Sequence, residues 1–350
     1  MGIKNLKQTL KDRAPESIKI LTSDMLRGKT VAVDIASWIY AFATTTAIVN
    51  PVHLLVTLDE EAIHEGILKR TQTILQARAI PVFVFDGNPP ECKERTLQKR
   101  RESRQSIFER AKKCDNMPER AKLLRQTIRP SRDTSERIRE SLSTMGLITI
   151  AAPGEAEAQC AHMCSSGKVW AVVSVDSDTL VFGAPRVIQN FSSKEMREGK
   201  TYILCLETIL CKLGMNIQQF TDYCILCGCD YTGTLKGIGP KRAFEGICNH
   251  GTIENFIHYT QSIEKKPKKR KRNDTNSSYV NLNTTTPIVE ECGANTSPDN
   301  ECNFELARRM FKEPDVIFRP NIDATTFPLN LMINNISDYL NYYQTFSLCK

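Results

Sequence analysis

Three short stretches decide the fold class: TVAVD at residues 30–34, PVFVFD at 81–86 and WAVVSVD at 170–176. Each is rich in Val and aromatic residues and too short for a helix, so we expect three buried parallel strands. Residues 59–77, between the first two, carry apolar side chains at helical spacing. Strands that alternate with helices predict an α/β fold with a mainly parallel central sheet.

Acidic side chains stand at the ends of these predicted strands. Asp34, Asp86 and Asp176 each close one strand, and Asp178 follows two residues later. Ligand sites of open parallel sheets form outside the carboxyl ends of the strands, so we expect the four carboxylates in one crevice. Residues two apart on an extended segment point the same way, so Asp176 and Asp178 can share a site. One such Asp alone is commonly a turn or cap residue, but the combination favours a metal site.

Three more carboxylates extend the set. Glu155 and Glu157 stand at a predicted helix start, and Asp230 ends the segment CILCGCD. A like-charge pair at 4 Å costs about 1 kcal/mol in water and about 4 kcal/mol at an effective dielectric of 20, so divalent cations make the cluster tenable. Oxygen ligands favour Mg²⁺ or Mn²⁺ over zinc. Two such ions about 4 Å apart can activate a water and stabilise the leaving oxygen of a phosphodiester.

Basic residues are concentrated in two zones. The net charge of the 350 residues is +7, while residues 91–140 alone hold 16 basic and 9 acidic residues and residues 265–272 hold seven basic residues and no acid. This pattern suits a polyanion on one surface and clustered carboxylates elsewhere; a solvated helical face with a disordered tail is the alternative. Residues 91–143 are helix-prone with little apolar stripe, least of all at 110–114, and are expected to project from the body.

The remaining features exclude several classes of protein. No run of eighteen apolar residues occurs, so we expect no membrane-spanning helix. The first residues lack the apolar segment of a secretory signal, and the thirteen cysteines are expected to be reduced thiols. Cys224, Cys227 and Cys229 lack a second pair of zinc ligands and are assigned to a buried helix. Residues 265–303 have the Asn- and Thr-rich composition of a disordered insertion.

Seven motifs, in order, resemble the XPG/flap endonuclease family: MGIKNL, VAVDIASWIY, VFVFDGNPP, APGEAEAQCA, VDSDTLVFG, CILCGCDY and GIGPKRA. The resemblance covers residues 1 to about 258, and residues 304–314 show a weaker similarity. It implies a PIN-like nuclease domain with a helical arch and a helix-two-turn-helix element. It also implies metal-dependent, structure-specific cleavage of DNA at 5′ flaps, usually with 5′ exonuclease activity, in replication, repair or recombination.

Roles for individual residues follow from the same resemblance. It implies ligation of two Mg²⁺ ions, with Mn²⁺ as a substitute, by the seven acids Asp34, Asp86, Glu155, Glu157, Asp176, Asp178 and Asp230. Lys93 and Arg100 match the basic arch residues that contact the scissile phosphate, and cations there can neutralise developing charge. Tyr40 matches the aromatic residue that stacks on a terminal base. Gly2 matches the residue placed close to DNA at the junction.

A glycine-rich turn resembles the duplex-binding element of the family. Gly237 and Gly239 let backbone N–H groups approach a phosphate at a helix N-terminus, and Lys241 and Arg242 can add phosphate contacts. In the family this turn also holds K⁺. Asn88 and Gly154 replace a Lys and a Ser of the family motifs.

The resemblance also suggests how the chain is divided. Residues 1–106 and 141–258 are expected to form the nuclease regions, 107–140 the rest of the arch, 265–303 the insertion and 304–350 a C-terminal segment. The run at 265–272 resembles a nuclear localisation signal, with the cytoplasm as the alternative. We find no clamp-binding motif near the C-terminus and expect a monomer on branched DNA. Three readings stay open: a flap nuclease, an exonuclease or junction-resolving relative, and a non-catalytic nucleic-acid-binding scaffold.

Overall fold

The computed structural model describes residues 3–264, 302–320, 322 and 324–347, without the side chains of 263–264 and 342–347. Seven strands form the main sheet, in the order β1-β9-β8-β7-β2-β5-β6. Their bounds are Ile18–Ile20 (β1), Thr30–Asp34 (β2), Ile80–Phe85 (β5), Ile148–Ala151 (β6), Ala171–Val173 (β7), Arg186–Gln189 (β8) and Tyr202–Cys205 (β9). Strands β8, β7, β2, β5 and β6 pair in parallel, and β9 pairs antiparallel with β8 and β1. The predicted α/β fold with a mainly parallel sheet is confirmed.

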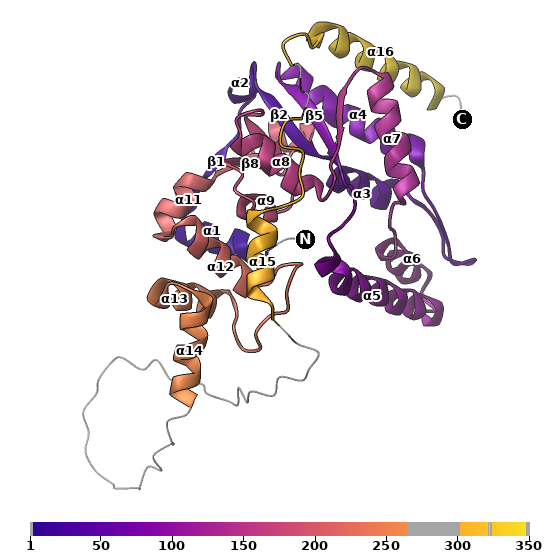
Figure 1. Cartoon of the computed structure of the whole chain (residues 1–350). Helices are drawn as coiled ribbons and strands as arrows, with labels where there is room; N and C mark the ends of the chain where they lie inside the picture. Colours follow the sequence, from indigo (N-terminus) through magenta and orange to yellow (C-terminus); the bar gives the residue numbers. More distant parts are fainter. Residues whose placement is uncertain (1–2, 265–301, 321, 323, 348–350) are drawn as a thin grey trace, which may run out of the picture.

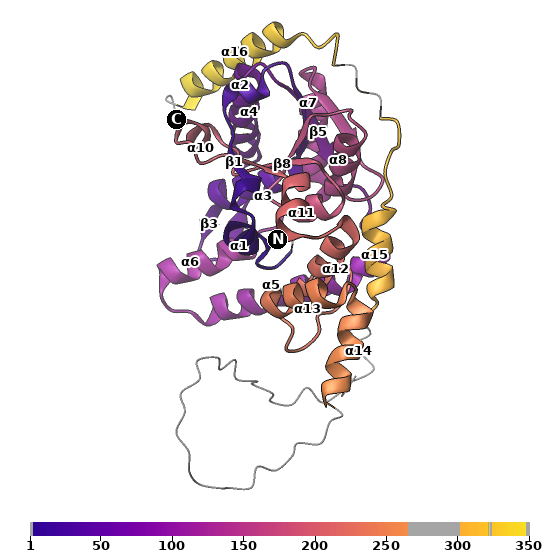
Figure 2. The same ribbon diagram turned by 90° about the vertical axis from the view of Figure 1, so that its left-hand side faces the viewer.

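Helices cover both faces of the sheet (Figures 1 and 2). One face packs against α3 (Ile35–Thr46), α4 (Glu60–Gln76) and α7 (Arg132–Thr144), and α16 (Leu329–Ser347) packs on α4. The other packs against α1 (Leu6–Arg13), α8 (Ala156–Ser165), α9 (Asp178–Val181), α11 (Leu206–Leu213) and α12 (Ile217–Cys227). Short helices α2 (Ser23–Leu26) and α10 (Ser193–Arg197) complete the body.

Strand β5 shows why the sequence gives this layered arrangement. Val82 and Val84 lie in the core beneath α8, whereas Phe83 and Phe85 lie in the core beneath α3 and α4. Successive side chains of a strand point to opposite faces, so a continuous apolar run supplies both cores. Helix α4 matches the predicted helical segment, with Asp59 as its N-cap.

The third predicted strand is much shorter than its sequence suggests. Strand β7 ends at Val173, and the backbone N–H of Asp176 donates to the Ser174 hydroxyl at 3.0 Å. The N–H of Asp178 then donates to Asp176 Oδ1 at 3.2 Å, and α9 begins at Asp178. The expectation that Asp176 and Asp178 lie on one extended segment is therefore wrong. Local bonds from Ser and Asp side chains replace the ladder and turn the chain into a helix.

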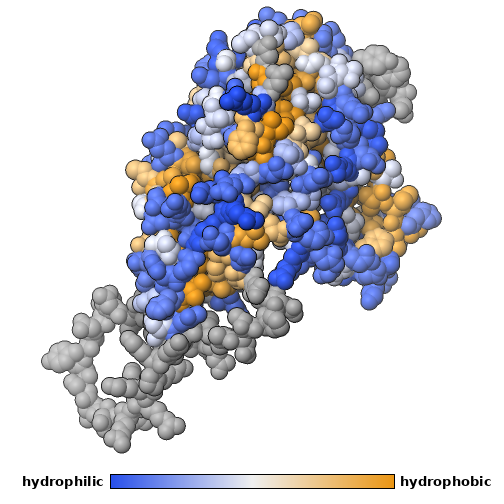
Figure 3. All heavy atoms as spheres, in the orientation of Figure 1, coloured by the Kyte–Doolittle hydropathy of each residue, from blue (hydrophilic) through white to orange (hydrophobic). Residues whose placement is uncertain are grey.

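The basic segment forms three helices. Two of them, α5 (Glu94–Lys113) and α6 (Met117–Gln126), lie beside a hairpin that the sequence did not indicate, β3 (Ile48–Asn50) and β4 (Leu55–Thr57). The third is α7, and here the expectation that the segment projects from the body is wrong, because Ile138 and Leu142 are buried in the core that α3 and α4 share. The expectation of little apolar anchoring near 110–114 is wrong at Ala111, which is fully buried with Leu123 and Leu124. Apolar side chains of the hairpin pack against this small core. Figure 3 shows apolar surface gathered at the hairpin, beside α6.

Helices α13 (Pro240–His250), α14 (Ile253–Glu264) and α15 (Phe304–Lys312) pack around α12 and extend away from the sheet (Figure 1). The Arg308 guanidinium lies 2.6 Å from Asp222 and 2.7 Å from Glu254, which joins α15 to α12 and α14. Cys224 and Cys227 are buried in α12, as predicted, but Cys229 lies beyond the C-terminal end of this helix and is half-buried. The run 265–272 and the insertion up to residue 301 lie outside the described residues. Within the described part, no helix is long and apolar enough to cross a membrane.

Candidate active site

The acidic residues gather at the carboxyl ends of three neighbouring strands. Asp34 ends β2, Asp86 follows β5 and Asp176 follows β7, and β2 pairs with both other strands. Glu155 is the N-cap residue of α8, and Glu157 lies in the first turn of that helix. The topology therefore brings acids from distant parts of the sequence to one edge of the sheet, as expected from the strand ends.

Three carboxylates approach one another closely. Oxygen atoms of Glu157, Asp176 and Asp178 lie within 4.8 Å of one another. Asp178 is 1% exposed, and its Oδ1 atom is buried without a hydrogen-bond partner among the described residues. A buried carboxylate oxygen without a donor costs free energy unless a cation approaches it. The donor set, made of hard oxygen ligands, fits a divalent ion such as Mg²⁺ or Mn²⁺.

Asp34 and Asp86 are oriented by neighbouring hydrogen-bond donors. The Ser174 hydroxyl donates to Asp34 Oδ2 at 2.8 Å. The backbone N–H of Ala156, at the start of α8, donates to Asp86 Oδ1 at 2.9 Å. Helix N-termini favour negative charge, so α8 stabilises the Asp86 carboxylate while presenting Glu155 and Glu157 from the same turn.

The electrostatics of the cluster are unfavourable without a cation. Burial, followed by the charge of Asp86, raises the pKa of Asp34 from 3.8 to about 7. Burial and the neighbouring carboxylates also raise the pKa values of Glu157 and Asp178 well above their ordinary range. Low dielectric and like charge both disfavour the ionised forms. A divalent cation would favour the ionised carboxylates and so lower these pKa values, which supports the assignment of the acid cluster as a metal site.

Basic side chains of the arch reach the same cluster. Lys93 Nζ bonds Glu155 and lies 3.2 Å from Asp230 Oδ2 and 3.9 Å from Glu157. Arg100 Nη2 lies 2.8 Å from both carboxylate oxygens of Asp230. Burial alone would lower the pKa of Lys93, but the three carboxylates outweigh it and raise that pKa. The N-cap residue of α5, Lys93, and Arg100 in its second turn therefore hold two cations beside the acids.

Tyr231 is a site residue that the sequence reasoning did not select. Its hydroxyl donates to Glu155 Oε2, and its side chain is almost fully buried. Burial and the adjacent Glu155 raise the pKa of the Tyr231 phenol, so it stays a hydrogen-bond donor. The sequence could have indicated Tyr231, because it directly follows Asp230 and closes the family motif CILCGCDY.

The predicted DNA-contacting residues lie on the surface or outside the described part. Tyr40, on α3, is 43% exposed, although a Tyr that follows a strand is more often buried in the core. Gly2 lies outside the described residues. Gly237 has φ 79°, which favours glycine, and Gly239 is the N-cap residue of α13. Lys241 is exposed in the first turn of α13.

Arg242 and the two departures from the family motifs have specific contacts. Arg242 Nη1 donates to the Gly237 carbonyl at 2.8 Å and so helps to hold the turn. A Cβ atom at Gly154 would lie 3.0 Å from the Asp315 carbonyl oxygen, so the path of the C-terminal segment leaves little room for a larger residue there. Asn88 accepts a hydrogen bond from Arg132 at 3.2 Å.

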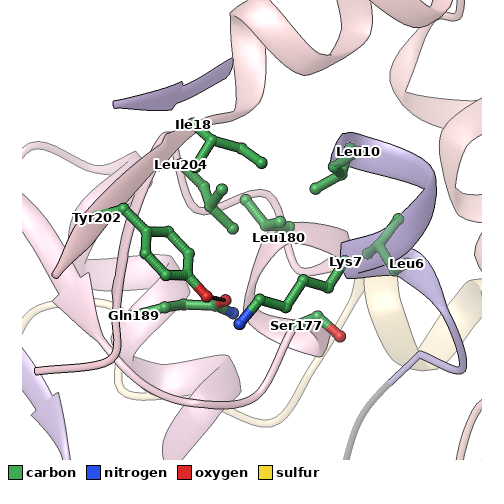
Figure 4. Close-up of a pocket in the computed structure, with 9 residues that line it drawn as sticks. All are labelled: Leu6, Lys7, Leu10, Ile18, Ser177, Leu180, Gln189, Tyr202 and Leu204. Atoms are coloured by element: carbon green, nitrogen blue, oxygen red, sulfur yellow. Dashed lines mark hydrogen bonds between the residues drawn. The ribbon is translucent and has the colours of Figure 1, made fainter. Parts of the chain in front are cut away.

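A small cavity beside α1 is not the substrate site. It is lined by Leu10, Leu180 and Leu204 together with Lys7 and Tyr202 (Figure 4). Its volume of about 10 Å³ admits about one water molecule. None of the seven acids lines it.

Comparison with known proteins agrees with this geometry. The XPG N-terminal domain matches residues 1–107, and the XPG I-region matches residues 146–230. Flap endonuclease 1 of Ostreococcus lucimarinus is 34% identical over 321 residues, which span 91% of this chain and 75% of that protein. The chain belongs to the XPG/flap endonuclease family. Flap endonuclease 1 of Cryptosporidium muris is 39% identical over 271 residues, which span 74% of this chain and 57% of the relative.

Solved structures share the fold of this family member. The catalytic core of Rad2 in complex with a DNA substrate superposes with a TM-score of 0.65 at 23% identity, covering 97% of this chain and 95% of Rad2. Flap endonuclease-1 from Methanococcus jannaschii superposes with a TM-score of 0.56 at 25% identity, covering 94% of this chain and 99% of that chain. The PIN-like nuclease fold that the sequence suggested is thereby confirmed.

Proposed function

We propose that this chain is a divalent-metal-dependent, structure-specific nuclease that cleaves DNA at 5′ flaps and removes nucleotides from 5′ ends. The observation that carries the proposal is the meeting of the acid cluster with Lys93 and Arg100 at the edge of the sheet. Carboxylates alone suit many metal enzymes. Cations delivered from a projecting helix add a binding site for the phosphate that is to be cut.

The metal site would consist of all seven acids. Asp34, Asp86, Glu155, Glu157, Asp176, Asp178 and Asp230 would hold two Mg²⁺ ions, with Mn²⁺ as a substitute. Bound metal would supply the activated water and neutralise charge on the departing oxygen. The unpartnered Oδ1 atom of Asp178 and the raised pKa values of the buried acids support this role.

The chain's own residues would position the DNA. Lys93 and Arg100 would bind the scissile phosphate, and Tyr40 would stack on the terminal base through its exposed ring. The backbone at Gly237 and Gly239 would approach a duplex phosphate at the N-terminus of α13, and Lys241 would contact the same backbone. Gly2 would lie close to the junction.

We also propose a cation at the duplex-binding turn. K⁺ would be held by carbonyl oxygens between α12 and α13. The Gly237 carbonyl already accepts a bond from Arg242, so that pair would set the shape of the turn while other carbonyls coordinate the ion. Phosphate contact by Arg242 would then use its remaining nitrogens.

The proposed division into regions follows the site. Residues 1–106 and 141–258 would build the nuclease body, 107–140 the rest of the arch and 304–350 a C-terminal segment. The 265–303 insertion would carry the basic run, which we propose directs the protein to the nucleus. The protein would act as a monomer on DNA.

A cleavage assay with matched substrates tests the proposed function. A 5′-flap duplex, a nicked duplex and a four-way junction, each labelled at the 5′ end, are incubated with the protein in Mg²⁺ and in EDTA. We expect Mg²⁺-dependent cleavage at the base of the flap to be fastest. Faster mononucleotide release from the nick would indicate an exonuclease, and paired symmetrical cuts in the junction would indicate a resolvase. DNA binding without cleavage of any substrate would indicate a scaffold.

A further inference from the structure

Each carboxylate oxygen of Glu155 has its own side-chain donor. Lys93 Nζ bonds Oε1, and the Tyr231 hydroxyl bonds Oε2. The Glu155 side chain makes no capping bond to α8, although Glu155 is the N-cap residue. Its orientation is therefore set by these two side chains, which approach it from segments distant in sequence.

The two donors have opposite consequences for a metal ion. An ammonium group neutralises the carboxylate but repels a nearby divalent cation. A phenol is neutral, so it can fix the orientation of a carboxylate without opposing the charge of the metal. Hydrogen-bonded partners of metal ligands commonly act in this way, by fixing the orientation of the ligand.

The Tyr231 ring is itself held firmly in place. Phe311 meets it edge to face at 5.0 Å between ring centroids, and Phe182 does so at 6.4 Å. Phe311 lies in α15, three residues after Arg308, whose ion pairs fix that helix to α12 and α14. Edge-to-face aromatic pairs restrict the rotation of a ring as well as burying it.

We propose that Tyr231 is a positioning residue that orients the Glu155 carboxylate toward the metal, and that Phe311 of α15 keeps the Tyr231 ring in the required place. This inference rests on the proposed function, because it assigns Glu155 to the metal site. It gives the helix after the insertion a part in metal binding, although α15 supplies no metal ligand.

The direct test replaces Tyr231 by Phe, which removes one hydroxyl and keeps the packed ring. Tyr223→Phe is the matched control, because Tyr223 is fully buried and donates to the neutral Thr9 hydroxyl at 2.8 Å. Mn²⁺ binding is measured by electron paramagnetic resonance of the free ion, without DNA, and thermal melting in EDTA reports on the fold. We expect Tyr231→Phe to bind Mn²⁺ about 10-fold more weakly or worse, within the range of about 10–100-fold typical for such partners.

The control and a second variant separate positioning from packing. Tyr223→Phe should bind Mn²⁺ like the wild type. Phe311→Ala, which leaves the phenol in place but loosens its ring, should weaken Mn²⁺ binding in the same direction and by a smaller factor. In single-turnover flap cleavage, Tyr231→Phe should need a proportionally higher Mg²⁺ concentration and should regain its rate when Mg²⁺ saturates.

Two outcomes would overturn the proposal. If Tyr231→Phe binds Mn²⁺ as tightly as the wild type, Tyr231 only packs in the core. The same conclusion follows if the Tyr223→Phe control loses as much Mn²⁺ affinity as Tyr231→Phe. Failure of the proposed function gives a different result. In that case the wild type would cut no flap, while Tyr231→Phe would still bind Mn²⁺ more weakly than the wild type.

Discussion

Replacing Asp34 by Asn should stabilise the protein in the absence of metal and at the same time abolish its nuclease activity. Asp34 is 7% exposed, and burial together with Asp86 raises its pKa from 3.8 to about 7. The amide keeps the shape of the side chain and can still accept from the Ser174 hydroxyl. It removes one negative charge from a cluster that repels itself and that needs this charge to bind metal.

The sign and size of the expected change in stability follow from the linkage between protonation and folding. Between pH 3.8 and about 7 the folded protein holds a proton on Asp34 that the unfolded chain has lost, so stability falls as pH rises. The two pKa values differ by about three units, and each unit is worth about 1.4 kcal/mol, which gives about 4 kcal/mol once the pH exceeds 7. At about 2–4 °C for each kcal/mol in a large domain, the melting temperature should change by roughly 10 °C.

The assay is thermal melting in EDTA at pH 5 and pH 8, repeated at pH 8 with excess Mg²⁺. The wild type should melt lower at pH 8 than at pH 5, and Mg²⁺ should restore much of the difference. Asp34→Asn should melt above the wild type at pH 8 in EDTA and gain less from Mg²⁺. Asp24→Asn is the control, because that carboxylate is 87% exposed and should change neither value. A metal-free Asp34→Asn protein that melts below the wild type at pH 8 would refute the reasoning.

Three further changes have defined expectations. Asp86→Asn should nearly abolish cleavage while flap binding, measured by fluorescence anisotropy, is retained; a wild-type cleavage rate would remove Asp86 from the site. Lys93→Ala should slow single-turnover cleavage by about 10²–10³-fold with little loss of affinity, because its cation acts on developing charge; weaker binding at an unchanged rate would contradict this. Deletion of residues 265–303 should leave cleavage of naked DNA intact and reduce nuclear accumulation in cells. If the deletion instead leaves the distribution unchanged and flattens the salt dependence, at about 0.9 in slope for each lost phosphate contact, the run is a DNA-binding arm.

The sequence predicts those parts of the site that depend on local patterns. Strand-end acids can be found because a short apolar run marks a buried strand, and parallel strands end at the same edge of a sheet. Helix α4 also falls within the predicted segment 59–77, because its apolar residues follow the helical period. The short strand β7 shows the limit of this reasoning, since the hydroxyl of Ser174 ends the strand at Val173, two residues before the apolar pattern ends at Val175.

Contacts between residues that are distant in the sequence could not be predicted from local patterns. Lys93 and Glu155 are 62 residues apart, and Arg100 and Asp230 are 130 apart. Local sequence patterns identify each of these residues as acidic or basic, and the structure shows that Lys93 and Arg100 contact the proposed metal ligands Glu155 and Asp230. The hairpin β3–β4 was missed because each strand has only three residues, too few to show alternation.

Gln159 shows how far the geometry of the acids depends on residues outside their own motifs. This fully buried side chain, one helical turn after Glu155, accepts the N–H of Ile317 at 2.6 Å and donates to the Ile317 carbonyl at 3.1 Å. The two bonds pair an amide side chain with the backbone N–H and C=O of a single residue 158 positions away. Helix α8 is thereby fixed on its outer side by the segment after α15, while Phe311 fixes Tyr231 against Glu155 on the inner side. The acids of α8 therefore depend for their position on a C-terminal segment that carries none of them.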